Sequence, residues 1–98
     1  MIAHHVLFWL IADTTADQKA AFRKSLETLK NIEVLKFFHV GTPAPIDREV
    51  VDTSYTFSLL LAFDDLDAHN TYQSHALHQA FLDEFRVFFK KVVIYDAE

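Results

Sequence analysis

Residues 2–12 have the sequence Ile2-Ala-His-His-Val-Leu-Phe-Trp-Leu-Ile-Ala12. This stretch decides the fold, because its β-branched, aromatic and aliphatic residues predict a long strand. Side chains alternate between the two faces of a strand. One face would carry His4, Val6, Phe8 and Leu10, and the other would carry His5, Leu7, Trp9 and Ile11. Since both rows are largely apolar, both faces of this strand need cover.

The remaining signals place helices and strands around this strand in a definite order. Residues 16–31 predict an amphipathic helix, and Thr15 and Gln18 have the spacing of a capping box. Further strands are predicted over residues 34–40, 55–63 and 91–96, and helices over residues 66–73 and 75–89. A polar loop of roughly a dozen residues follows Gly41, and loops of that length are often functional.

The order of these elements is β-α-β-β-α-β, with the second helical segment in two pieces. This order predicts an α+β fold of the ferredoxin-like kind, in which helices cover one face of a four-stranded antiparallel sheet. The chain has 98 residues, which is the size of one domain, so we expect a single domain over residues 1–98.

The other face of that sheet predicts a homodimer. Helices on one face leave an apolar patch in water on the opposite face, made of Leu7, Trp9, Ile11 and Leu60. An exposed apolar patch of this extent marks an interface. The simplest cover is the same face of a second copy, related by a two-fold axis. The alternative is that Trp9 is a single tolerated surface aromatic.

Composition excludes several classes of partner. The net charge is −5 and no basic patch is visible, so nucleic acid is not expected as a partner. The longest apolar run has seven residues, Val6 to Ala12, whereas a membrane span needs about 20. No secretory signal is recognised at the N-terminus, so a cytoplasmic protein is expected. The absence of cysteine excludes disulfides, thiolate nucleophiles and thiolate zinc sites.

The six histidines direct attention to acid–base chemistry. No common metal or nucleophile motif organises them, and His can transfer protons near neutral pH. His78 belongs to the apolar stripe of the last helix, so its side chain is expected to face the sheet. Tyr72 lies six residues earlier, roughly 120° away on a continuous helix. A break near Ser74, with Ser74 or His75 capping a new helix, would bring Tyr72 and His78 together.

His4 lies on the strand row that would face the helices, so it could share a pocket with His78. A neutral His beside a phenol in an apolar pocket is a proton-transfer pair. Each residue also has a purely structural interpretation: His4 as a core histidine, Tyr72 as a half-buried tyrosine, His75 as a helix cap. Phe81 fits either the core or a cavity wall. A metal site on His75 and His78 lacks a suitably spaced carboxylate, and no metal is expected.

Four segments of the chain resemble the stress-responsive A/B barrel (Dabb) family. They are Met1-Ile-Ala-His-His-Val-Leu-Phe8, the Tyr55–Phe63 strand with Asp64-Asp-Leu66, the Tyr72…His75-Ala-Leu-His78…Phe81 segment, and Val93-Ile-Tyr-Asp96. Each segment is short, and the resemblance lies in their joint order along essentially the whole chain. It implies a dimeric α/β barrel in which the sheets of two protomers close face to face.

The resemblance to a plant polyketide cyclase of this family implies roles for residues. His78 would be the general base, and Tyr72 would stabilise the developing enolate. Substrate contacts would come from His4, Phe57, His75, Phe81 and Asp96, with Asp96 also fixing His78. Phe57 replaces a polar histidine of the cyclase pocket, and Ala76 replaces a proline.

Three functions therefore stay open. The first is a lyase or cyclase that needs no cofactor and acts on an apolar, carbonyl-bearing small molecule. The second is a non-catalytic dimer, either stress-associated or binding a small hydrophobic molecule. The third is a cofactor-free monooxygenase, a reaction found in other dimeric ferredoxin-like barrels.

Overall fold

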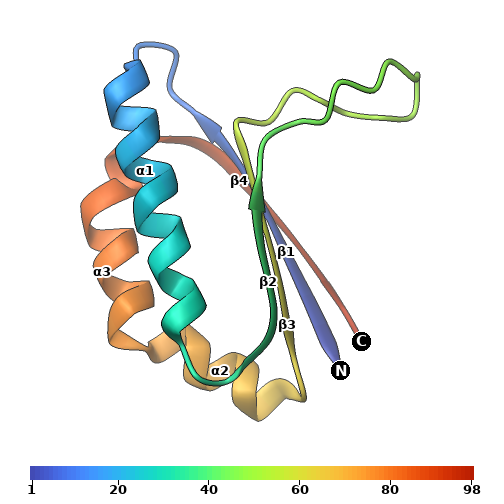
Figure 1. Ribbon diagram of the computed structural model, residues 1–98, viewed down its shortest axis with the longest axis vertical. Helices are drawn as coiled ribbons and strands as arrows, with labels where there is room; N and C mark the ends of the chain where they lie inside the picture. Colours follow the sequence, from blue (N-terminus) through green and yellow to red (C-terminus); the bar gives the residue numbers. More distant parts are fainter.

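A computed structural model describes residues 1–98, and its helices lie on one face of a four-stranded antiparallel sheet (Figure 1). In chain order the elements are β1 (Ile2–Leu10), α1 (Ala16–Thr28), η1 (Leu29–Asn31), β2 (Leu35–Gly41), β3 (Phe57–Phe63), α2 (Leu66–Ser74), α3 (Ala76–Phe85), η2 (Arg86–Phe88) and β4 (Phe89–Ala97). The strand order is β2-β3-β1-β4. The predicted α+β ferredoxin-like fold is confirmed.

Several predicted boundaries were wrong by a few residues. The first strand ends at Leu10 rather than at residue 12. At Leu10 the backbone N–H donates to the Thr56 hydroxyl. The helices predicted over residues 16–31 and 75–89 both end early, in short 3₁₀ turns. Such turns are a common way to finish an α-helix. The capping box of Thr15 and Gln18 is confirmed.

Alternation along β1 separates the core from the open face as predicted. Ile2, His4, Val6, Phe8 and Leu10 are buried, whereas the side chains between them are partly or fully exposed. The buried row packs against apolar residues of α1, α3 and β3. These form one core cluster of 15 residues: Ile2, Val6, Phe8, Leu10, Phe22, Leu26, Leu29, Ile32, Phe57, Leu59, Leu61, Phe63, Tyr72, Phe81 and Phe85.

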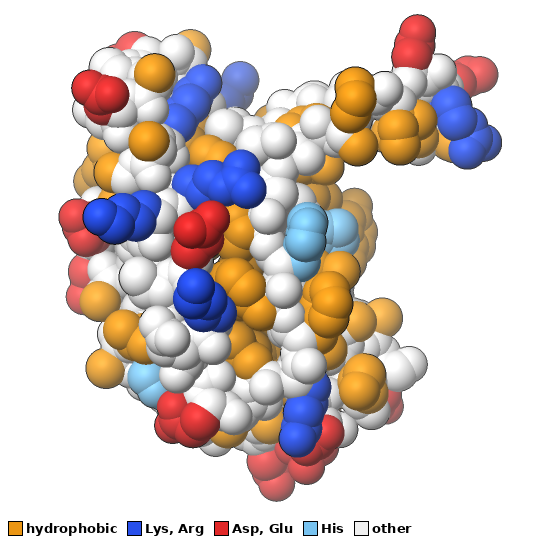
Figure 2. Space-filling view, viewed as in Figure 1, with side chains coloured by type: hydrophobic (Ala, Val, Ile, Leu, Met, Phe, Trp, Pro, Cys, Tyr) orange, Lys and Arg blue, Asp and Glu red, His pale blue; other side chains and the backbone are white.

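No helix covers the opposite face of the sheet, which we call the open face (Figure 1). Leu7, Trp9 and Leu60 lie on this face and are only partly buried, and Ile11 follows the end of β1. In the strand register Phe37 and Tyr95 belong to the same face, and they are 51% and 63% exposed. Figure 2 shows histidine and hydrophobic side chains gathered along this side of the molecule.

The loop between β2 and β3 projects away from the body of the molecule (Figure 1). Its exposed apolar side chains include Ile46 and Val50. Within the loop, Asp52 accepts hydrogen bonds from both the backbone and the hydroxyl of Ser54. Among the helices, none combines the length and the apolar character that crossing a membrane requires.

Candidate functional site

A cavity of about 160 Å³ lies between the sheet and the helices. Its walls come from β1, β3 and β4 on one side and from η1, α2 and α3 on the other. The lining residues are His4, Val6, Phe8, Leu29, Leu59, Tyr72, Gln73, His78, Phe81, Leu82, Phe89, Val92 and Ile94. Of these, 10 are hydrophobic. Small-molecule sites are usually apolar hollows that contain a few polar groups.

The break between α2 and α3 shapes the polar end of this cavity. His75 has extended backbone angles (φ −64°, ψ 142°), so it ends one helix and starts the next. Its Nδ1 accepts a hydrogen bond from the Leu77 backbone N–H at 3.1 Å, which caps α3. The predicted break is confirmed. As a result, the rings of Tyr72 and His78 lie with their centroids 4.7 Å apart.

His78 is held in a defined tautomer. Its Nδ1–H donates to the backbone carbonyl of Gln73 at 3.0 Å. A carbonyl only accepts hydrogen bonds, so in the neutral ring Nδ1 carries the hydrogen and Nε2 keeps a free lone pair. Burial lowers the pKa of His78 below its usual 6.5; the Gln73 carbonyl opposes this shift, and the nearby His4 and His69 add to it. His78 is therefore a neutral base at pH 7.

Tyr72 is 1% exposed and lines the same cavity. Burial raises the pKa of its hydroxyl far above 10.0, and no hydrogen bond or neighbouring charge offsets that effect. Every side-chain nitrogen or oxygen atom that is completely buried has a hydrogen-bond partner. The Tyr72 hydroxyl has no such partner, so it must border open space. The Tyr72 hydroxyl therefore keeps its proton and faces the hollow, where it can donate to a bound oxygen.

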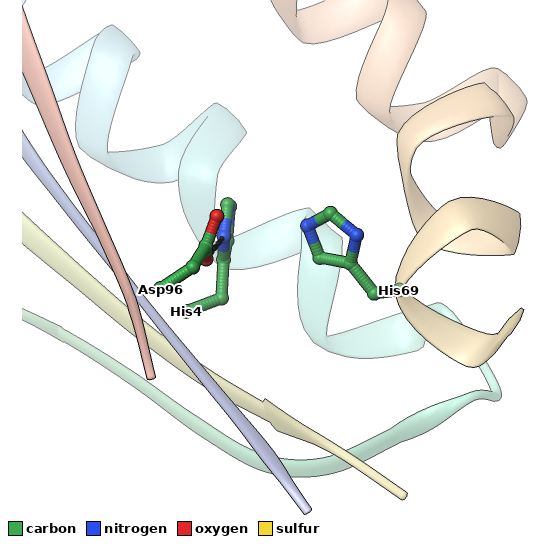
Figure 3. A group of neighbouring side chains, drawn as sticks. All are labelled: His4, His69 and Asp96. Carbon is green, nitrogen blue, oxygen red and sulfur yellow. Dashed lines mark hydrogen bonds and ion pairs between the residues drawn. The ribbon is translucent and has the colours of Figure 1, made fainter. Parts of the chain in front are cut away.

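His4 and Asp96 form a second polar group beside this pair. They face each other across β1 and β4, and the His4 Nδ1 is hydrogen-bonded to the Asp96 carboxylate. His69 on α2 points towards them from the helical side (Figure 3). The rings of His4 and His69 have centroids 5.0 Å apart in an edge-on arrangement. The prediction that Asp96 fixes His78 was therefore wrong, because β4 pairs Asp96 with His4 instead.

Three residues predicted as substrate contacts, His75, Phe57 and Asp96, do not line the cavity. Asp96 lines a separate surface depression. His75 is used as the helix cap, and its Nε2 lies 3.7 Å from the Glu33 carboxylate. Phe57 is buried in the core cluster and stacked on Phe22 with ring centroids 5.4 Å apart. Phe81 does line the cavity. Phe57 therefore contributes to the core rather than to the surface that a ligand would meet.

Two residues near the site, His69 and Gln73, were not predicted. Gln73 lines the cavity and holds two rings, since its carbonyl accepts from His78 and its amide nitrogen donates to His69 Nε2 at 3.2 Å. His69 lies one helical turn before Tyr72 and Gln73. That i, i+3 and i, i+4 spacing was the available signal, because such residues share one helix face.

The family model of the stress responsive A/B barrel domain matches residues 2–98. The chain belongs to this family. The match spans all nine helices and strands, so the Dabb family accounts for the whole fold. Among curated proteins, no match to the sequence was found.

Solved structures share this Dabb fold. A dimeric ferredoxin-like protein of unknown function from Thermobifida fusca is 26% identical, with a TM-score of 0.81, and the match covers 98% of this chain and 88% of that one. A Dabb family protein from Mesorhizobium loti is 24% identical, with a TM-score of 0.76 and coverage of 99% and 94%. A hydroxynitrile lyase from Passiflora edulis is 18% identical, with a TM-score of 0.80 and coverage of 98% and 90%.

Proposed function

We propose that this protein is a lyase or cyclase that needs no cofactor and acts on a small, apolar carbonyl compound. His78 would remove a proton from the carbon next to the carbonyl group. Tyr72 would donate a hydrogen bond to the carbonyl oxygen as negative charge develops on it. In a cyclase, this enolate would attack a second carbonyl carbon, and the alkoxide formed would take the proton back from His78. In a lyase, His78 would instead remove the proton of a β-hydroxyl group, and the enolate would form as the carbon–carbon bond breaks.

The proposal rests on the pairing of His78, a neutral base, with Tyr72, a proton donor that has no hydrogen-bond partner. The hydrogen bond from Nδ1 to Gln73 leaves Nε2 of His78 as the basic atom. A base poised near neutral pH and a hydrogen-bond donor aimed at a developing oxyanion are the two components that enolisation needs. Because the surroundings are apolar, both interactions are stronger than they would be in water.

The size of the cavity limits the substrate. It measures about 160 Å³, and an apolar cavity of about 150 Å³ binds benzene. We therefore expect a substrate with one ring or a short chain rather than a long polyketide. The similarity of the fold to a hydroxynitrile lyase supports the proposal only in that this fold is compatible with a lyase.

Deuterium exchange tests the proposed function without knowledge of the product. Small β-diketones and single-ring ketones would be incubated with the protein in D₂O, and loss of the α-proton signal would be followed by NMR. We expect the wild type to catalyse exchange on at least one compound and His78→Ala to lose it. The matched control is Asp83→Ala, on an exposed position of α3. Exchange by His78→Ala at the wild-type rate would contradict the role of His78.

A second function, binding of a small hydrophobic ligand without catalysis, is favoured by the lining of the cavity. Ten of its 13 residues are hydrophobic, and apolar burial alone provides affinity. On this alternative, the same compounds bind the wild type and His78→Ala with similar affinity and neither protein catalyses exchange. Titration calorimetry on both proteins therefore separates the two functions.

We also propose that the protein is a homodimer, joined through the open face. The row of Leu7, Trp9 and Leu60 supports this, since an apolar patch of this extent usually marks an interface. Related structures from Thermobifida fusca, Bacteroides fragilis and Jannaschia are described as dimeric. The cavity lies on the other side of the sheet, so each protomer would hold its own site.

A further inference from the structure

Three potential metal ligands converge at one end of the sheet. His4 comes from β1, His69 from α2 and Asp96 from β4 (Figure 3). Each offers one ring nitrogen or carboxylate oxygen, and these atoms all lie within 4.8 Å of one another. None of the three is used as acid or base in the proposed function.

The strand register brings two of these ligands together. His4 and Asp96 are directly paired in the antiparallel ladder of β1 and β4. Both side chains therefore rise from the same face of the sheet, the face that α2 covers. His69 approaches from α2, and the amide of Gln73 lies 3.2 Å from its Nε2. The Nε2 lone pair of His69 accepts that hydrogen bond, so an ion that binds through Nε2 would have to displace the Gln73 amide.

The spacing is close to what one ion requires. Metal bonds to imidazole nitrogen and carboxylate oxygen are about 2.1 Å long, so two ligand atoms on one ion are at most about 4.2 Å apart. The widest gap in this group is no more than 4.8 Å, so it would close by up to about 0.6 Å for ligands on opposite sides of the ion and by up to about 1.4 Å for tetrahedral geometry, in which ligand atoms are about 3.4 Å apart. Side-chain rotation supplies such a shift, because Asp96 is exposed and His69 is half-buried.

The group also lies where an ion could reach it. His4 lines the internal cavity, while His69 and Asp96 line a separate surface depression with Ile2, Leu66, Ala97 and Glu98. An ion entering from the depression would meet Asp96 and His69 first and then His4. It would keep one or more coordination positions open towards solvent.

We propose that His4, His69 and Asp96 bind one divalent transition-metal ion per chain, such as zinc or iron(II). Two imidazoles and one carboxylate with open positions is a donor set typical of those ions in proteins. The ion would replace the hydrogen bond that now joins His4 to Asp96. This site lies beyond the proposed function, since neither His78 nor Tyr72 is among the ligands.

Calorimetric titration with Zn²⁺ tests the proposal. The protein would be expressed without a histidine tag, treated with EDTA and exchanged into metal-free buffer. We expect one Zn²⁺ per chain, and affinity weakened about tenfold or more in both His69→Gln and Asp96→Asn. The matched control is Glu33→Gln, which removes the carboxylate from the other His–carboxylate contact, at His75, and should bind like the wild type.

The proposal is overturned if the wild type takes up no Zn²⁺ in the micromolar range, or if His69→Gln and Asp96→Asn bind as tightly as the wild type. A second readout is the visible absorption of bound Co²⁺, which should appear in the wild type and vanish in His69→Gln. The deuterium-exchange assay on EDTA-treated protein reports separately on His78. Failure of one proposal therefore leaves the other intact.

Discussion

The rings of Tyr72 and His78 lie 4.7 Å apart although the two residues belong to different helices. On one continuous helix, residues six apart would point about 120° away from each other. The break at His75 removes that separation and turns both side chains into the cavity. The site therefore depends on a helix boundary as much as on the two side chains themselves.

Replacing Tyr72 by phenylalanine should separate catalysis from stability. The hydroxyl has no hydrogen-bonding or charged neighbour that shifts its pKa, so its removal should change the free energy of unfolding by less than about 1 kcal/mol. Loss of the donor to the developing oxyanion should slow exchange by about a hundredfold. Urea unfolding and the deuterium-exchange rate measure the two effects. Tyr55→Phe, outside the cavity, is the control, and it should leave the rate unchanged.

The pH dependence of exchange should reflect the lowered pKa of His78. Only the neutral ring can accept a proton. Burial lowers the pKa of this ring below its usual 6.5, so the ring stays neutral to a lower pH. The rate should therefore reach half of its maximum at a pH below 6.5, as the ring becomes protonated in the folded protein. A midpoint at or above pH 6.5 would mean that His78 is not the titrating base.

The same shift makes folding stability depend on pH. Between the pKa of folded His78 and 6.5, the unfolded chain binds more protons than the folded chain, so stability rises with pH in that interval. Acidification from pH 7.5 to 5.5 should destabilise the wild type more than His78→Gln, which cannot titrate. Urea unfolding at both pH values measures the difference. Equal losses in the two proteins would contradict the assignment.

Much of the fold could be predicted because the apolar patterns are local. Alternation in β1 was sufficient to separate the buried row of His4, Val6 and Phe8 from the row on the open face. The Thr15 capping box likewise depends on residues three apart. The 3₁₀ endings of α1 and α3 were missed, because apolar residues continue past the last helical turn and the sequence does not mark the change in geometry.

The site was harder to predict because it depends on pairing between distant residues. The partner of Asp96 follows from the register of β1 and β4, which joins residues at opposite ends of the chain. Without that register, resemblance alone had assigned Asp96 to His78. His69 was missed for the same reason, since its proximity to His4 appears only when α2 is packed on the sheet.

His75 should act on stability rather than on substrate binding. Its ring accepts the hydrogen bond that caps α3, and loss of an N-cap costs about 1 kcal/mol. His75→Ala should lower the free energy of unfolding by about that amount, and His75→Asp, which can also cap, should restore most of it. Urea unfolding measures both variants. The Michaelis constant of His75→Asp should equal that of the wild type; a large increase would instead identify His75 as a substrate contact.

The open face should determine the oligomeric state. Trp9 lies on this face near the end of β1, two residues after Leu7, and the Nζ of Lys91 on β4 is 4.7 Å from the centroid of its ring. A glutamate at this position would place a charge in the proposed interface, and burying an unpaired charge is strongly unfavourable. Trp9→Glu should therefore be monomeric at concentrations where the wild type is dimeric.

Sedimentation velocity at micromolar concentration measures this directly. The matched control is Val87→Glu, because Val87 is an apolar residue that is 72% exposed and lies on η2, outside the open face. If apolar exposure alone drove association, the two variants would behave alike. A dimeric Val87→Glu beside a monomeric Trp9→Glu locates the interface on the open face. A monomeric wild type would show that this face stays in water or meets a different partner.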